Sequence, residues 1–155
     1  MHRTIGFVGV GNMGKPMAER LVAAGFDLVV YDTNADAVAA LVAKGARRAA
    51  STADLADQVE TVFLSLPTPP IVETVAKGLQ GKALRRVVDL STTGPQKSRD
   101  LSAELGARNV RWLDSPVSGG VGGAVAGTLA VMSSGPQADY DDLQDALKAL
   151  GKPFY

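Results

Sequence analysis

The stretch that decides the fold is TIGFVGVGNMGKPMAERLVAAGFDLVVYD, residues 4–32. It begins with an apolar run rich in strand-forming residues, which leads directly into a G-x-G-x-x-G turn made by Gly9, Gly11 and Gly14. Apolar residues at helical spacing come next, and a second apolar run then ends at Asp32. This order predicts a strand, a glycine turn, a helix and a second strand that ends in an acidic residue.

Each glycine of the turn has its own steric reason. Gly9 lets the chain turn tightly off the strand, and Gly14 lets the helix pack closely on the sheet. A side chain at Gly11 would keep a pyrophosphate away from the backbone. The N-terminus of the helix offers free N–H groups and the positive end of a dipole to phosphates. A β-α-β unit that binds nothing is the alternative. The complete context favours a dinucleotide site, in which the other turn residues are Val10, Asn12 and Met13.

The residues after the second strand predict which dinucleotide binds. The Asp32 carboxylate can accept two hydrogen bonds from ribose hydroxyls, and it would repel a 2′-phosphate. Thr33 and Asn34, which follow it, supply no cation to receive that phosphate. We therefore predict NAD rather than NADP, with Asp32 and Thr33 at the ribose. A solvated aspartate without a ligand is the alternative.

Composition limits the class of protein. The 155 residues are 46% hydrophobic and 21% charged, which suits one globular domain over residues 1–155. Basic and acidic residues balance at 16 each, so neither nucleic acid nor a membrane is an expected partner. The chain has no cysteine, and the first strand starts too early to leave room for a signal peptide, so we expect a cytoplasmic protein. The single histidine, His2, is interpreted as a solvated terminal residue, and no metal site is expected.

Strands and helices alternate along the rest of the chain. Helices are predicted over 34–44, 51–57, 71–79, 96–105, 124–127 and 138–150. Strands are predicted over 59–66, 86–90, 110–114 and 128–133, with 46–50 either a strand or a connector and 154–155 the start of another strand. Residues 67–70 are predicted to form a rigid, proline-rich loop. The alternation indicates an α/β fold with a doubly wound, mainly parallel sheet, in which ligands bind beyond the carboxyl ends of the strands.

Three segments at that edge are candidates for ligand contact. Leu66 and Pro67 offer apolar surface and fixed backbone to a cofactor, or form a rigid turn with no ligand. Ser91 and Thr92 either hydrogen-bond near a nicotinamide or cap the helix that begins around Pro95, and the residues alone favour the cap. The glycine-rich segment 115–123 could present several N–H groups to an anion, and its proline and valines make it unlike a flexible linker.

Taken together, these motifs resemble the β-hydroxyacid dehydrogenase family, which includes 3-hydroxyisobutyrate dehydrogenases and tartronate semialdehyde reductases. The resemblance covers essentially the whole chain. It rests on the turn and helix start at 9–18, on Leu66-Pro67, on Asp89-Leu90-Ser91-Thr92, on the block 114–120 and on Gly127-Thr128-Leu129. The block 114–120 is the specific part, since it looks like the substrate-binding signature of the family.

The resemblance implies more than the residues alone. It implies that Leu66, Pro67 and Thr92 contact the cofactor, and that Ser118, Gly119 and Gly120 bind the substrate. The implied reaction is reversible hydride transfer between the cofactor and a small β-hydroxy acid, with a lysine as general acid and base. A homo-oligomer is also expected, because an uncovered apolar surface favours self-association.

One part of the family pattern is absent. The family's catalytic lysine lies on a long helix that follows the strand begun at 154–155, and a helical C-terminal domain comes after it. None of the seven lysines of this chain matches that position. We therefore expect the cofactor-binding half of a dehydrogenase, with no catalytic residue of its own. The alternatives are an NAD-binding module without turnover and a domain of an imine-reductase-like enzyme.

Overall fold

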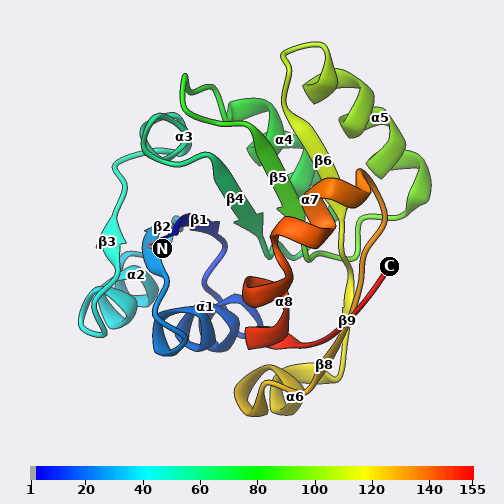
Figure 1. Ribbon diagram of the computed structural model, residues 1–155. Coiled ribbons are helices and arrows are strands. Elements are labelled where there is room, and N and C mark those ends of the chain that lie inside the picture. Colours follow the sequence, from blue (N-terminus) through cyan, green and yellow to red (C-terminus); the bar gives the residue numbers. More distant parts are fainter. Residues whose placement is uncertain (1–2) are drawn as a thin grey trace.

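A sheet of six parallel strands forms the centre of the fold in the computed structural model, which describes residues 3–155 (Figure 1). His2, interpreted above as solvated, lies outside the described residues. The strands are β1 (Thr4–Val8), β2 (Asp27–Tyr31), β3 (Arg47–Arg48), β4 (Thr61–Leu64), β5 (Arg86–Asp89) and β6 (Arg111–Asp114). They lie in the order β3-β2-β1-β4-β5-β6, and every neighbouring pair is parallel. The predicted doubly wound fold is confirmed, and its topological switch point lies between β1 and β4.

Helices cover both faces of this sheet. On one face, α1 (Gly14–Ala23), α2 (Ala35–Val42) and α8 (Gln144–Leu150) enclose an apolar core with Phe7, Val30 and Phe63. On the other face, α3 (Thr52–Gln58), α4 (Pro69–Gly78) and α5 (Pro95–Gly106) enclose a second core with Val62, Leu64 and Val87. Strands buried on both faces explain the near-continuous apolar runs in the sequence. Among residues 3–155, no helix combines the length and the apolar character needed to cross a membrane.

Short polar side chains fix several helix starts. Asn34 caps α2 by accepting hydrogen bonds from the N–H groups of Asp36 and Ala37, as its position predicts. Thr68 caps α4 in the same way, so this helix begins at Pro69. The loop predicted over residues 67–70 is therefore too long. Proline is tolerated in the first turn of a helix, where its missing N–H has no helical partner to lose.

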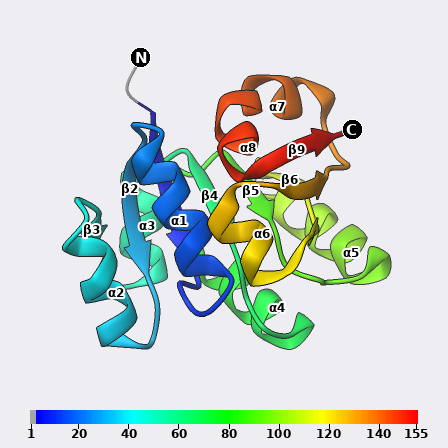
Figure 2. The same ribbon diagram turned by 90° about the horizontal axis from the view of Figure 1, so that it is seen from below.

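A second, three-stranded sheet follows β6. It contains β7 (Val117–Ser118), β8 (Leu129–Met132) and β9 (Gly151–Phe154), with β7 antiparallel and β9 parallel to β8. Between β7 and β8, the helix α6 (Gly120–Ala126) lies beside α1 (Figure 2). The sequence predicts this helix only from residue 124, because glycine disfavours helices. Gly123 serves packing, because a Cβ atom there would come within 3.1 Å of Leu129.

The C-terminal helix is broken in two. One amphipathic helix over 138–150 is predicted, but α7 (Gln137–Asp142) and α8 are separated by Leu143. Asp139 ties α7 to the sheet, because its carboxylate accepts hydrogen bonds from Arg86 and from Arg111. Leu143 itself is 1% exposed. The break thus follows a segment that is bound to two arginines of the sheet, and local periodicity does not contain this information.

Candidate nucleotide-binding site

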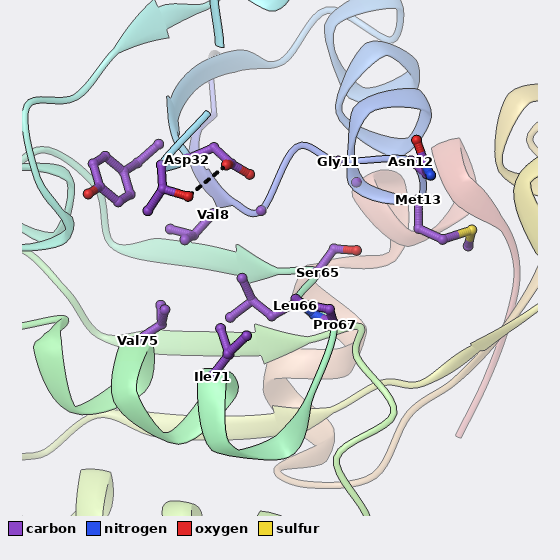
Figure 3. Close-up of a pocket in the computed structure, with 14 residues that line it drawn as sticks. Val8, Gly11, Asn12, Met13, Asp32, Ser65, Leu66, Pro67, Ile71 and Val75 are labelled. Carbon is purple, nitrogen blue, oxygen red and sulfur yellow. Dashed lines mark hydrogen bonds between the residues drawn. The ribbon is translucent and has the colours of Figure 1, made fainter. Parts of the chain in front are cut away.

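A cavity of about 610 Å³ opens beyond the carboxyl ends of β1, β2 and β4 (Figure 3). This is the switch point of the sheet, where open α/β folds bind their ligands. Most of the residues predicted to contact a cofactor line this one cleft: Gly9, Gly11, Asn12, Met13, Gly14, Asp32, Thr33, Leu66 and Pro67. Its size lies within the range of small-molecule sites.

The glycine turn has the geometry that a phosphate site requires. Gly9 has a φ of 94°, and a Cβ atom there would lie 2.0 Å from the carbonyl oxygen of Ser65. A Cβ atom at Gly14 would lie 1.7 Å from the carbonyl oxygen of Gly9. At Gly11, by contrast, a Cβ atom would meet no protein atom within 4 Å. Gly9 and Gly14 therefore allow the turn to fold, whereas Gly11 keeps the cleft open beside the backbone.

The N-terminus of α1 is free of competing negative charge. Met13 occupies the cap position, and its side chain makes no capping hydrogen bond to the first turn. That turn also carries no acidic residue. The helix dipole and the first N–H groups therefore favour an anion at this point of the cleft.

Asp32 is held in place by two backbone N–H groups. One carboxylate oxygen accepts the N–H of Val10 and the other accepts the N–H of Asn34, each at 2.8 Å. The oxygens retain lone pairs for further donors such as ribose hydroxyls. Val10 itself does not line the cleft, because its side chain is 1% exposed. It acts on the site by positioning Asp32, a role that the motif alone did not reveal.

An apolar wall that the sequence reasoning missed closes the cleft opposite Asp32. Ile71 and Val75 point from α4 toward the glycine turn, next to Leu66 (Figure 3). Val8, Tyr31 and Ser65 complete the lining. Ile71 is 41% exposed although Val72 beside it is fully buried, and this difference appears only in the folded chain.

A hydrogen-bonded link joins the loop after β4 to the loop after β5. The hydroxyl oxygen of Ser91 accepts the N–H of Leu66 at 2.9 Å. The capping role favoured for Ser91 and Thr92 is wrong, since Gly94 occupies the cap position of α5 and that helix has no side-chain cap among the residues described. Thr92 is exposed on this loop and does not line the cleft.

The predicted substrate residues lie apart from the cleft. Ser118 ends β7, Gly119 has a φ of 138°, and Gly120 opens α6. All three are exposed, and none of them lines the cleft. The residues predicted to contact the substrate therefore do not form part of this cleft.

None of the lysines in residues 3–155 lines the cleft. Lys15 and Lys44 reach Glu19 at 4.0 and 3.2 Å. Lys77 and Lys97 both reach Glu73, whose pKa these two partners lower to about 2. The remaining lysines, Lys82, Lys148 and Lys152, are exposed.

Comparison with known proteins gives a family match over nearly the whole chain. The family model described as the NAD binding domain of 6-phosphogluconate dehydrogenase matches residues 4–155. The 2-(hydroxymethyl)glutarate dehydrogenase of Eubacterium barkeri is 37% identical over 97% of this chain and 52% of its own length. Among solved structures, 3-hydroxyisobutyrate dehydrogenase of Mycobacterium tuberculosis with L-serine has a TM-score of 0.94 and 30% identity, covering 99% of this chain and 54% of that one.

Imine reductases share the fold as well. The imine reductase of Streptomyces aurantiacus is 28% identical, with a TM-score of 0.89 over 99% of this chain and 55% of that one. The chain therefore spans about half the length of the relatives that it matches. The resemblance to 3-hydroxyisobutyrate dehydrogenases is confirmed, and the matched half is the one that binds the dinucleotide. The fold, the glycine turn and the family match together show that this chain belongs to the family of NAD-binding domains typified by that of 6-phosphogluconate dehydrogenase.

Proposed function

We propose that this chain is the cofactor-binding half of an NAD-dependent oxidoreductase that acts on a small β-hydroxy acid of the 3-hydroxyisobutyrate or glycerate type. The observation that carries the proposal is the cleft itself, in which the open Gly11, the N-terminus of α1 and the anchored Asp32 face one space. When bound, the nicotinamide supplies hydride transfer. The chain's own residues bind and orient the dinucleotide.

The order of the strands supports one direction for the bound dinucleotide. Asp32, at the end of β2, receives the ribose of the adenosine half, and the wall of Ile71 and Val75 contacts its adenine. The glycine turn after β1 receives the pyrophosphate. The nicotinamide half then extends past Leu66 and Pro67, after β4, toward Thr92, after β5. Ser118, Gly119 and Gly120 remain the proposed substrate residues.

Asp32 makes the preference for NAD testable. In Asp32→Asn we expect NAD affinity to fall about tenfold or more, since hydrogen bonds to a charged group are worth about 1.5–3 kcal/mol. NADP affinity should rise relative to NAD, because the charge that repels a 2′-phosphate is gone. Calorimetric titration of both cofactors measures this. The control is Asp36→Asn, because Asp36 is an exposed acid in the first turn of α2, outside the cleft. A wild-type chain that prefers NADP would overturn the assignment.

An activity assay tests whether this chain can catalyse the reaction without the other half of the enzyme. We expect this chain alone to produce no NADH from 3-hydroxyisobutyrate, serine or glycerate, because no described lysine reaches the cleft. NADH absorbance measures the reaction, and NAD binding by the same sample shows that the protein is folded. Turnover by this chain would contradict the proposal.

Two alternatives and two further properties belong to the same proposal. Likeness to the Streptomyces aurantiacus enzyme favours a half of an imine reductase as the second candidate, and reduction of a cyclic imine by the full-length protein would select it. A non-catalytic NAD-binding module would bind NAD, whereas its full-length form would neither oxidise a hydroxy acid nor reduce an imine. The proposal includes self-association through Val125, Met132 and Phe154, which are 44–61% exposed, and a cytoplasmic location. Sedimentation and cell fractionation test these two properties.

A further inference from the structure

Asp89 is a fully buried carboxylate that no part of the proposed function uses. It is the last residue of β5, and its exposed fraction is 0%. One of its oxygens accepts the N–H of Ser91 at 3.0 Å, and the other accepts the hydroxyl of Thr93. Both partners lie on the loop that leads to α5, so one carboxylate fixes this loop on either side of Thr92.

The hydrogen bonds of Asp89 continue into the cleft. Ser91, which Asp89 holds, accepts the N–H of Leu66. Leu66 lines the cleft and packs over the glycine turn, where a Cβ atom on Gly9 would lie 2.9 Å from its side chain. A chain of contacts therefore runs from Asp89 through Ser91 and Leu66 to the turn after β1. It spans the three strand ends past which the proposed dinucleotide must extend.

We infer that Asp89 is a positioning residue for the nicotinamide half of the cofactor, because it sets the loop that carries Thr92 and locks that loop to Leu66. The inference rests on the proposed function. It predicts an asymmetry, since the adenosine half is held at Asp32 after β2, whose backbone partners, Val10 and Asn34, lie outside the loop that Asp89 holds. Loss of Asp89 should weaken the contribution of the nicotinamide half and leave that of the adenosine half intact.

The surroundings of Asp89 disfavour the ionised form of its side chain. Burial raises the pKa of Asp89 to about 6, although hydrogen bonds from Thr93 and Ser91 oppose the rise, and the neighbouring Asp114 adds to it. Asp114 is the register partner of Asp89 on β6 and is the charged group that faces it. A buried carboxylate loses the hydration of its charged form, which lowers the stability of the folded protein. The presence of Asp89 is therefore better explained by the loop that it orders than by a gain in stability.

The test compares two ligands, NAD and ADP, on the same protein by calorimetry. In Asp89→Ala we expect NAD affinity to fall about tenfold while ADP affinity stays within twofold. Asp89→Asn should restore most of the NAD affinity, because an amide can still accept from the Ser91 N–H and donate to the Thr93 hydroxyl. Ser91→Ala removes the link to Leu66 but keeps the bond from the Ser91 N–H to Asp89, and it should show a weaker form of the same asymmetry.

The matched control is Asp57→Ala. Asp57 also holds a loop, by accepting the N–H of Lys82 at 2.8 Å, but at the opposite edge of the sheet, ahead of β5. This variant should bind both ligands as the wild type does. Equal weakening of NAD and ADP in Asp89→Ala, or unchanged NAD binding in both Asp89→Ala and Ser91→Ala, would overturn the inference. Failure of the wild-type chain to bind NAD would instead overturn the proposed function.

Discussion

Replacing Gly14 by alanine is expected to destabilise this protein by about 3 kcal/mol or more. The added Cβ atom would lie 1.7 Å from the carbonyl oxygen of Gly9, which is backbone and cannot rotate away. The helix α1 must then move off β1, and overpacking of a core commonly costs about 1–3 kcal/mol even when side chains can adjust. Urea unfolding measures the loss, which corresponds to a melting temperature lower by roughly 6–12 °C in a chain of this size.

Gly11 is the matched position for this experiment. Alanine at Gly11 meets no protein atom within 4 Å, so its free energy of unfolding should stay within about 0.5 kcal/mol of the wild type. The methyl group instead projects toward the space assigned to the pyrophosphate, and NAD affinity should fall at least tenfold. If Gly14→Ala were as stable as Gly11→Ala, the result would contradict the close approach of α1 to the carbonyl oxygen of Gly9.

Replacing Asp139 by alanine is expected to cost about 3 kcal/mol of stability. Asp139 is 5% exposed and accepts hydrogen bonds from Arg86 at 3.2 Å and from Arg111 at 2.6 and 2.8 Å. The side chain of Arg86 is itself only 15% exposed, so the variant leaves a largely buried cation short of a partner. Breaking such a buried pair typically costs about 3–5 kcal/mol, and the half-exposed Arg111 places this case at the lower end.

The effect of Asp139 should depend on pH in a defined direction. Burial pushes the pKa of this carboxyl up, but the hydrogen bonds from Arg111 and Arg86 outweigh it and the pKa is lowered. The folded protein therefore binds this proton less tightly than the unfolded chain. The stabilisation is complete above the ordinary pKa of about 3.9 and is lost as the pH falls through the lower folded value. Urea unfolding at pH 7 and at about pH 3 should show the difference between variant and wild type shrinking in acid.

Asp142 provides the control on the same helix. Its side chain is 52% exposed although it also contacts Arg86, at 2.6 Å. Because exposed ion pairs contribute about 1 kcal/mol or less, Asp142→Ala should be nearly neutral. Equal destabilisation by the two alanine variants would contradict the importance of burial at Asp139.

The sequence predicted the parts of the site that are encoded locally. Gly9, Gly11, Gly14 and Asp32 fall within one contiguous stretch, and their steric and hydrogen-bonding roles follow from a strand, a turn and a helix in fixed order. The resemblance added Leu66 and Pro67, which the structure places in the same cleft. Val10 and Thr92 were predicted as contacts, and the structure places neither in the lining.

Other parts could not be predicted, because they depend on residues far apart in the chain. The wall formed by Ile71 and Val75 becomes part of the cleft only when α4 packs beside the glycine turn. The residues alone favoured a local capping role for Ser91, yet its hydroxyl accepts a hydrogen bond from Leu66, in the loop after the neighbouring strand β4. Periodicity cannot show such partners, since it records which face of an element is apolar and not what lies opposite.

By itself, then, the sequence determined the doubly wound fold and the dinucleotide turn. The periodicity of strands and helices is set within a few residues, and so is the need for glycine where two backbone segments come close together. Only the tertiary structure decided where α6 begins, why the C-terminal helix breaks at Leu143 and which loops Asp89 holds. Each of these depends on burial and hydrogen bonding between distant segments, whose energies exist only once the chain has folded.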